Sequence, residues 1–176
     1  MKRTTHTLLG AAVVVPLALA QEPALAAGCL WLGMAGAGLP DWLDLRSDFR
    51  ATLRHRGVSH SLLALAACVG VTWFMLRLFQ ANPIAMGEVD LSLSRHAVRV
   101  LTIALGLGFL SHLAADACTV AGIRPLLPFT QWRVWLLPRP LRGRTGGPLD
   151  TGTRWLAVTV LAFGLVLAAS RALGAP

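Results

Sequence analysis

The sequence predicts an all-α membrane protein, a polytopic bundle of about five hydrophobic helices with a metal site at its cytoplasmic face. Three observations indicate the membrane fold: 55% of the 176 residues are apolar, only 14% are charged, and the mean hydropathy is +0.63. A soluble domain of this length needs less apolar surface, so the composition indicates a lipid environment. No stretch has ordinary soluble composition, and residues 1–176 are therefore treated as one integral-membrane domain.

Five apolar segments lie at about residues 7–20, 24–39, 60–79, 97–115 and 154–173. A helical span needs about 20 apolar residues, so the last three are long enough and the first two are short. Gln21-Glu22-Pro23 separates the first two segments and is typical of a tight turn, with proline starting the next helix. We therefore expect a helical hairpin over 7–39 that returns the chain to its starting side. Glycines in 33–38 and 106–108 predict close helix packing.

The first thirty residues also resemble a secretory signal, because Lys2 and Arg3 precede an apolar run and small residues follow at 24–27. Apolar character resumes at once from Cys29. We therefore expect the segment to be retained, with cleavage as the alternative.

The distribution of Lys and Arg predicts the orientation. Counting spans from the hairpin assigns twelve of the sixteen basic residues to the face that holds the N-terminus, and four to the other face: Arg77, Arg95, Arg99 and Arg171. The positive-inside rule makes the richer face cytoplasmic. We expect a multi-pass protein of a bacterial-type inner membrane, with a cytoplasmic N-terminus and an external C-terminus. Because the net charge of +8 lies in connections where topology requires it, no direct nucleic-acid partner is expected.

Histidine and aspartate gather on the predicted cytoplasmic face. Counting places eight of them there: His6, His55, His60, His112, Asp41, Asp44, Asp48 and Asp116. Imidazole and carboxylate are ligands of zinc, manganese and iron, so this convergence predicts a divalent metal site. His96 falls on the opposite face and is excluded.

His112 and Asp116 form the tightest element of this set. A spacing of four residues places both side chains on one helix face, and Thr119 continues the stripe. An aspartate in a membrane helix is costly unless it is paired, protonated or liganded, so Asp116 needs a partner. The alternative is a hydrogen bond between His112 and Asp116 that caps the helix end.

The stretch from His55 to Ser61 is the second element. Gly57 allows the backbone to curl so that both imidazoles of this stretch point the same way, and Ser59 is expected to cap the following helix. Taken alone, these residues also suit a polar membrane interface.

A loop beginning at Pro40 is the third element. Asp41 in this loop is a candidate ligand or general base. The alternative is an acid pair, Asp41 and Asp44, that balances Arg46 and Arg50.

These stretches resemble the YdjM-type family of membrane-bound metal-dependent hydrolases, also described as LexA-binding, inner-membrane-associated hydrolases. The similarity covers about residues 4–138 and rests on Thr5-His6, Pro40-Asp41, Ser47, His55 to Leu62, and Leu110 to Asp116 followed by Thr119, Gly122, Leu126 and Pro128. By that resemblance the metal ligands are His6, Asp41, His55, His60, His112 and Asp116. The family usually reads Pro-Asp-x-Asp-His where this chain has Leu43 and Asp44, so Asp44 is expected to replace the second acid by a shifted turn.

The resemblance implies a hydrolase. The family is distantly similar to the zinc-dependent phospholipase C and P1-nuclease group, which favours a phosphoester, such as an anionic lipid, as substrate. One or two divalent ions, with zinc expected and manganese or iron as alternatives, would lower the pKa of bound water to about 7. Asp41 or Asp116 would take the proton, and the expected substrate contacts are Arg56, Ser59 and Thr119.

A non-enzymatic protein is the alternative. In that case a closed metal site staples the cytoplasmic loops, or the protein tethers a LexA-type regulator, as the family resemblance implies. A transporter is disfavoured because the sequence lacks internal repeats and a charged residue at mid-membrane depth. The sequence leaves the substrate and the metal open.

Overall fold

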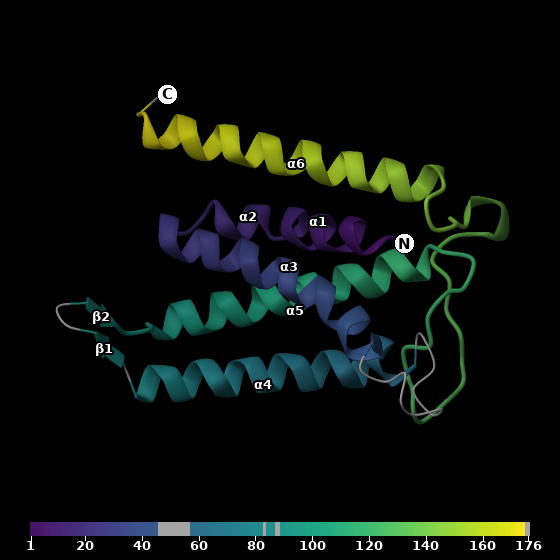
Figure 1. The fold of residues 1–176 in the computed structure, drawn as a ribbon, viewed down its shortest axis with the longest axis horizontal. Helices are drawn as coiled ribbons and strands as arrows, with labels where there is room; N and C mark the ends of the chain where they lie inside the picture. Colours follow the sequence, from purple (N-terminus) through teal and green to yellow (C-terminus); the bar gives the residue numbers. More distant parts are fainter. Residues whose placement is uncertain (46–56, 83, 87–88, 175–176) are drawn as a thin grey trace.

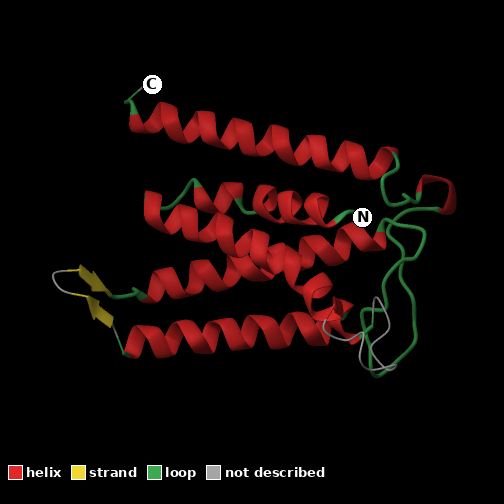
Figure 2. Cartoon of the chain, viewed as in Figure 1, coloured by secondary structure: helices red, strands yellow, loops and turns green. Residues whose placement is uncertain are grey.

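The computed structural model describes residues 1–45, 57–82, 84–86 and 89–174 as a bundle of helices (Figures 1 and 2). The helices are α1 (Arg3–Val13), α2 (Val15–Ala18), α3 (Pro23–Leu45), α4 (Leu62–Ala81), α5 (Arg95–Ala117) and α6 (Pro148–Ala172). Two 3-10 turns, η1 (Val58–His60) and η2 (Arg139–Leu141), and an antiparallel pair of short strands, β1 (Ile84–Met86) and β2 (Val89–Leu91), complete the described elements. The all-α membrane fold class is confirmed.

The apolar segments form helices of two kinds. Within the described residues, four helices are long and apolar enough to cross a membrane, namely residues Pro23–Asp44 of α3 and the whole of α4, α5 and α6. The first segment is instead divided between α1 and α2 at Val14, and each piece is shorter than a span. Pro16 is the second residue of α2. It has no backbone N–H, so it cannot donate the hydrogen bond that would continue α1.

The chain path follows the alternation counted from the sequence. The expected hairpin is present, because α1 and α2 run antiparallel to α3 (Figure 1). The N-terminus, the start of α4, the end of α5 and the start of α6 lie at one end of the bundle, which we call the cluster end. The strand pair and the C-terminus lie at the other end.

The core is organised around α5. Fifteen of its 23 residues are buried, whereas α4 has no buried residue and presents its apolar side chains outward. The backbones of helices α3 and α5 are in direct contact. A Cβ added at Gly108 would collide with the carbonyl of Gly33, and a Cβ added at Gly36 would collide with the carbonyl of Leu105. The predicted close packing of the glycine segments is therefore confirmed.

Two local predictions were wrong. Helix α3 continues through Pro40, so Asp41 and Asp44 stand on its last turns and not in a loop. A proline removes only one backbone donor from a helix, and the packing of α3 along α5 keeps the remaining turns helical. The cap of α4 is Ser61, whose hydroxyl accepts from Ala64 N at 3.2 Å, and not Ser59, because η1 takes up the preceding three residues.

The α3–α5 contact leads to a stability prediction. Gly108→Ala should lower the free energy of unfolding by about 1–3 kcal/mol, because the new methyl group overlaps the Gly33 carbonyl and the helices must separate. Gly70→Ala is the matched control, since a Cβ there meets nothing within 4 Å. Thermal unfolding of the detergent-purified variants measures both. Equal stability of the two variants would show that the close contact does not support the bundle.

Candidate metal centre

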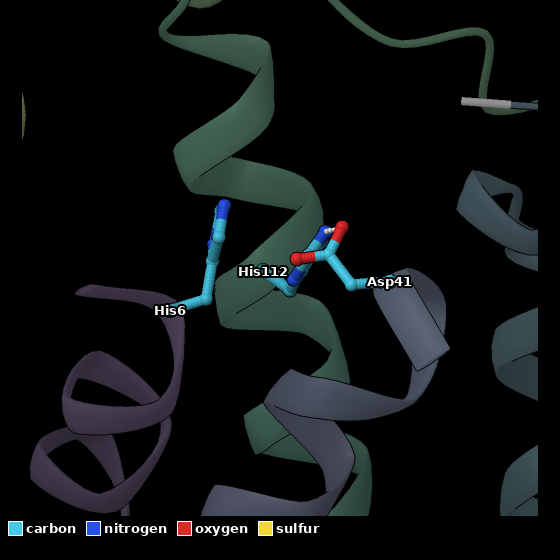
Figure 3. Close-up of side chains that lie close together, drawn as sticks. All are labelled: His6, Asp41 and His112. Atoms are coloured by element: carbon cyan, nitrogen blue, oxygen red, sulfur yellow. Dashed lines mark ion pairs between the residues drawn. The ribbon is translucent and has the colours of Figure 1, made fainter. Parts of the chain in front are cut away.

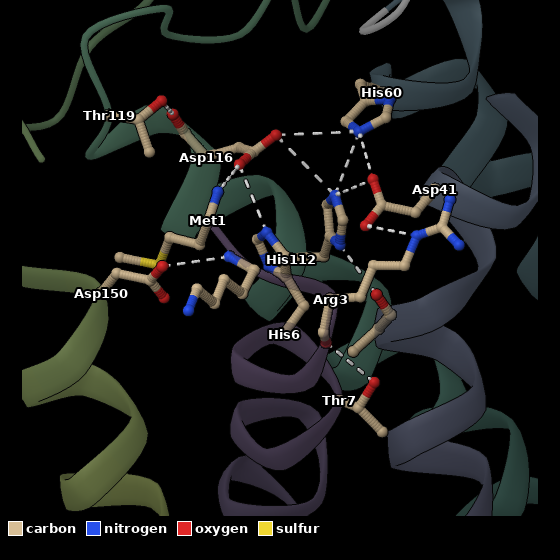
Figure 4. A network of polar contacts seen from close by, with 12 residues as sticks. Met1, Arg3, His6, Thr7, Asp41, His60, His112, Asp116, Thr119 and Asp150 are labelled. Carbon is tan, nitrogen blue, oxygen red and sulfur yellow. Dashed lines mark hydrogen bonds and ion pairs between the residues drawn. The ribbon is translucent and has the colours of Figure 1, made fainter. Parts of the chain in front are cut away.

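Five candidate ligands meet at the cluster end, and we call them the His/Asp cluster (Figure 4). They are His6 of α1, Asp41 of α3, His60 at the end of η1, and His112 and Asp116 of α5. Four of these side chains are at most 3% exposed, and Asp41 is 14% exposed. The cluster therefore lies inside the protein, with Asp41 on its most open side.

The distances between ligand atoms suit a metal ion. His60 Nε2 lies 3.1 Å from His112 Nε2, and both nitrogens lie 3.7–3.9 Å from an oxygen of Asp41 and an oxygen of Asp116. Ligand atoms about 2.0–2.2 Å from a tetrahedral ion are about 3.3–3.6 Å apart, so small shifts accommodate an ion. Two groups of three have ligand atoms that all lie within 4.8 Å of one another, His6 with Asp41 and His112 (Figure 3), and His60 with His112 and Asp116. Both groups contain His112.

The orientation of His112 is fixed by the backbone of α3. Its Nδ1 lies 2.7 Å from the carbonyl oxygen of Ala37, which can only accept a hydrogen bond. Assigning the ring proton to Nδ1 satisfies this contact and leaves the lone pair of Nε2 directed into the cluster. A backbone carbonyl is one of the groups that accept this hydrogen bond from metal-binding imidazoles.

His60 is held in the same manner by side chains. Its Nδ1 lies 3.0 Å from Ser59 Oγ and 3.5 Å from Asp44 Oδ2, and Ser59 donates a hydrogen bond to Asp44. An ionised carboxylate only accepts, so the proton belongs on Nδ1 and the lone pair of Nε2 faces His112. With this assignment two acceptor nitrogens face each other between carboxylates, and a cation there would relieve their repulsion.

His6 completes the buried wall of the cluster. Its ring stacks on that of His112, with centroids 3.8 Å apart, and its Nε2 lies 3.4 Å from Asp116 Oδ1. Its Nδ1 is buried and has no hydrogen-bond partner among the described residues. A buried polar atom without a partner is costly, so the ring has a nitrogen available for a ligand.

The other predicted site residues occupy different positions. Asp44 and Ser59 contact Nδ1 of His60, on the side of the ring turned away from the cluster. Thr119 is buried, and its hydroxyl donates to the backbone oxygen of Asp116 at 2.8 Å. His55 and Arg56 lie outside the described residues. The ligand role of Asp44 and the substrate contacts of Ser59 and Thr119 stay predictions. His96 lies in the first turn of α5, away from the cluster, with Nε2 2.7 Å from Gln21 Oε1.

Asp150 is a residue that the sequence reasoning missed. It is 2% exposed in the first turn of α6, and its Oδ2 accepts from the backbone amides of Lys2 at 3.2 Å and Gly146 at 2.6 Å. It therefore ties the start of α1, four residues before His6, to the loop that precedes α6. The available signal was an acid at the start of an apolar helix, outside residues 4–138, on which the resemblance seen in the sequence rests.

One comparison with known proteins gives a match. The model of the YdjM inner membrane protein family matches residues 1–173, nearly the whole chain. No curated protein and no solved structure matches the chain.

The buried contacts of Asp150 lead to a prediction. Asp150→Ala should lower the free energy of unfolding by about 2–4 kcal/mol, because two backbone donors lose a charged acceptor. Glu22→Ala removes an exposed acid next to the start of α3 and should change stability by less than about 0.5 kcal/mol. Thermal unfolding in detergent measures both. A loss for Asp150→Ala no larger than that of the control would contradict the assigned role.

Proposed function

The chain belongs to the YdjM inner membrane protein family, and from this membership and the His/Asp cluster we propose that it is a membrane-bound metal-dependent hydrolase. In this proposal the cluster holds one or two divalent ions, and metal-activated water attacks a phosphoester or related bond near the cytoplasmic membrane face. The protein lies in the membrane, in contact with lipid, through its long apolar helices.

One observation carries the metal proposal. The Nε2 atoms of His60 and His112 are acceptors 3.1 Å apart, with carboxylates of Asp41 and Asp116 beside both. The N-terminal ammonium of Met1 lies 3.3 Å from Asp116 Oδ1, and a divalent ion among the four acceptors would supply the further positive charge that offsets their repulsion. The nitrogen and oxygen donors suit zinc, and manganese or iron are the alternatives. His55, in the segment next to η1, is proposed as a further ligand.

The chemistry follows from the positions of the two acids. A divalent ion held by the cluster would lower the pKa of bound water to about 7, and water would then be the nucleophile. Asp41 is the more exposed carboxylate of the cluster, so we assign it the transfer of the proton from water. Asp116 contacts His6, His60 and His112, and we assign it to the metal itself, with proton transfer as its second role. Asp44 and Ser59 orient His60.

The orientation in the membrane follows from charge. The loop after α5 carries five arginines and no acid, and it lies at the cluster end (Figure 1). Together with the excess of basic residues in the N-terminal and 46–56 segments, this supports a cytoplasmic cluster end, a cytoplasmic N-terminus and an external C-terminus in a multi-pass inner-membrane protein. The LexA-type regulator implied by the family resemblance stays a prediction.

Reporter fusions test this orientation. Alkaline phosphatase fused after Asn82 or after Pro176 should be active, because both positions are assigned to the outside, whereas a fusion after Gly146 should be inactive. Green fluorescent protein at the same three positions should give the opposite pattern. Active phosphatase after Gly146 alone would reverse the assignment.

Metal content and turnover test the hydrolase proposal. Detergent-purified protein should hold about one or two divalent ions per chain and hydrolyse a phosphodiester such as bis(p-nitrophenyl) phosphate. The double variant His112→Ala, Asp116→Ala should lose the metal and at least about 100-fold in turnover. His96→Ala is the matched control, since it removes a histidine at the other end of α5 and should change neither.

The outcomes separate the two classes of function. If the metal is bound and lost as expected but no phosphoester turns over, the alternative of a structural metal staple gains support. If the wild-type protein binds no divalent ion, the metal proposal is wrong.

A further inference from the structure

A cleft of about 330 Å³ lies beside the His/Asp cluster, between α1 and α3. Its lining includes Arg3 and Thr7 of α1 and Gly38, Asp41 and Trp42 of α3. Asp41 belongs to both the cleft and the cluster, whereas His6, His60, His112 and Asp116 are at most 3% exposed. Among the described cluster residues, Asp41 thus marks the side from which a molecule can reach the site.

Arg3 gives this opening a positive charge. Its Nε lies 4.0 Å from Asp41 Oδ2, and its side chain is 59% exposed (Figure 4). An exposed ion pair at this distance is weak, so the guanidinium retains donors for another anion. The planar guanidinium matches the oxygens of a phosphate group in charge and in geometry.

We propose that this cleft binds the phosphate group of an anionic phosphoester and that Arg3 is its anion-binding residue. The inference rests on the proposed function and names the substrate's binding site. Asp41 lies between Arg3 and the imidazoles of His60 and His112, so a phosphate in the cleft has Arg3 on one side and the cluster on the other. A metal held by the cluster offsets the charge of Asp41 and attracts the same anion.

The size of the cleft limits the part of the substrate that enters. A volume of about 330 Å³ is at the lower end of the range for small-molecule sites, which is about 300–1,000 Å³. It accommodates a phosphate with a small substituent, while the rest of the substrate lies outside past the half-exposed Trp42. Both a phospholipid headgroup and a water-soluble phosphodiester have this chemistry.

Two substitutions test the cleft without changing a cluster residue. Arg3→Gln removes the charge, and Gly38→Leu fills the cleft, since a Cβ at Gly38 meets nothing within 4 Å. Both variants should retain the wild-type metal content. Both should raise the Kd of inorganic phosphate, and the KM for bis(p-nitrophenyl) phosphate, by about 10- to 100-fold, and Arg3→Lys should recover part of the loss.

Matched controls are available elsewhere in the chain. Arg99→Gln removes an exposed arginine of α5, and Gly70→Leu adds the same side chain to α4 where a Cβ also meets nothing within 4 Å. Neither should change phosphate affinity. The source of the phosphate is identified by comparing two substrates, vesicles of phosphatidylglycerol and the soluble diester. The substrate for which Arg3→Gln raises KM gives the substrate class. A raised KM for either substrate supports the site.

The result that would overturn the inference is an unchanged Kd for phosphate in both Arg3→Gln and Gly38→Leu at full metal content, or no phosphate binding by the metal-loaded wild type. This failure differs from failure of the proposed function. A wild type that binds metal and phosphate through Arg3 but hydrolyses nothing retains the site and loses the hydrolase. A wild type that hydrolyses phosphodiesters with no effect of either variant retains the hydrolase and loses the site.

Discussion

The close approach of α3 to α5 determines both the packing of the bundle and the geometry of the His/Asp cluster. Because Gly36 and Gly108 bring the two backbones into contact, His112 of α5 lies near enough to donate to the carbonyl of Ala37. That bond fixes which nitrogen of His112 faces the cluster. The same approach keeps α3 helical past Pro40, so that Asp41 extends toward the imidazoles of His60 and His112. A residue that separated these helices would therefore disturb packing and ligand geometry together.

The segments outside the helices close the cluster from its other sides. Leu62 N donates to Pro125 O at 2.8 Å, which joins the start of α4, and with it His60, to the loop after α5. Asp150 joins the next part of that loop, at Gly146, to the start of α1. The segments that carry His60 and His6 are thus both held by hydrogen bonds to segments more than fifty residues away in sequence, at Pro125 and at Asp150. The long loop has a structural role beyond its arginines.

Patterns within single segments were the part of the site that could be predicted. The spacing of His112 and Asp116 fixes a common helix face, and counting apolar spans brings His6, Asp41 and His60 to the same end of the bundle. Local propensity misled at Pro40, because tertiary packing on α5 overrides a helix-breaking residue. Asp150 bonds a backbone amide 148 positions away and Arg3 pairs with Asp41 across two helices. Contacts of this range leave no periodic signal in the sequence.

A metal and a proton would make different contacts with the acceptors of the cluster. Protonating one imidazole would also relieve the repulsion between His60 Nε2 and His112 Nε2. The new donor would then point at the other imidazole nitrogen, 3.1 Å away, and not at a carboxylate. The observed distances from these nitrogens to Asp41 and Asp116 are 3.7–3.9 Å, longer than hydrogen bonds. An ion with ligands about 2.0–2.2 Å away places them about 3.3–3.6 Å apart. The distance of 3.1 Å between the two nitrogens and the distances of 3.7–3.9 Å to the carboxylates lie on either side of this range. A proton between the two imidazoles therefore leaves both carboxylates without a bond from it, whereas an ion at the centre would contact the imidazoles and the carboxylates together.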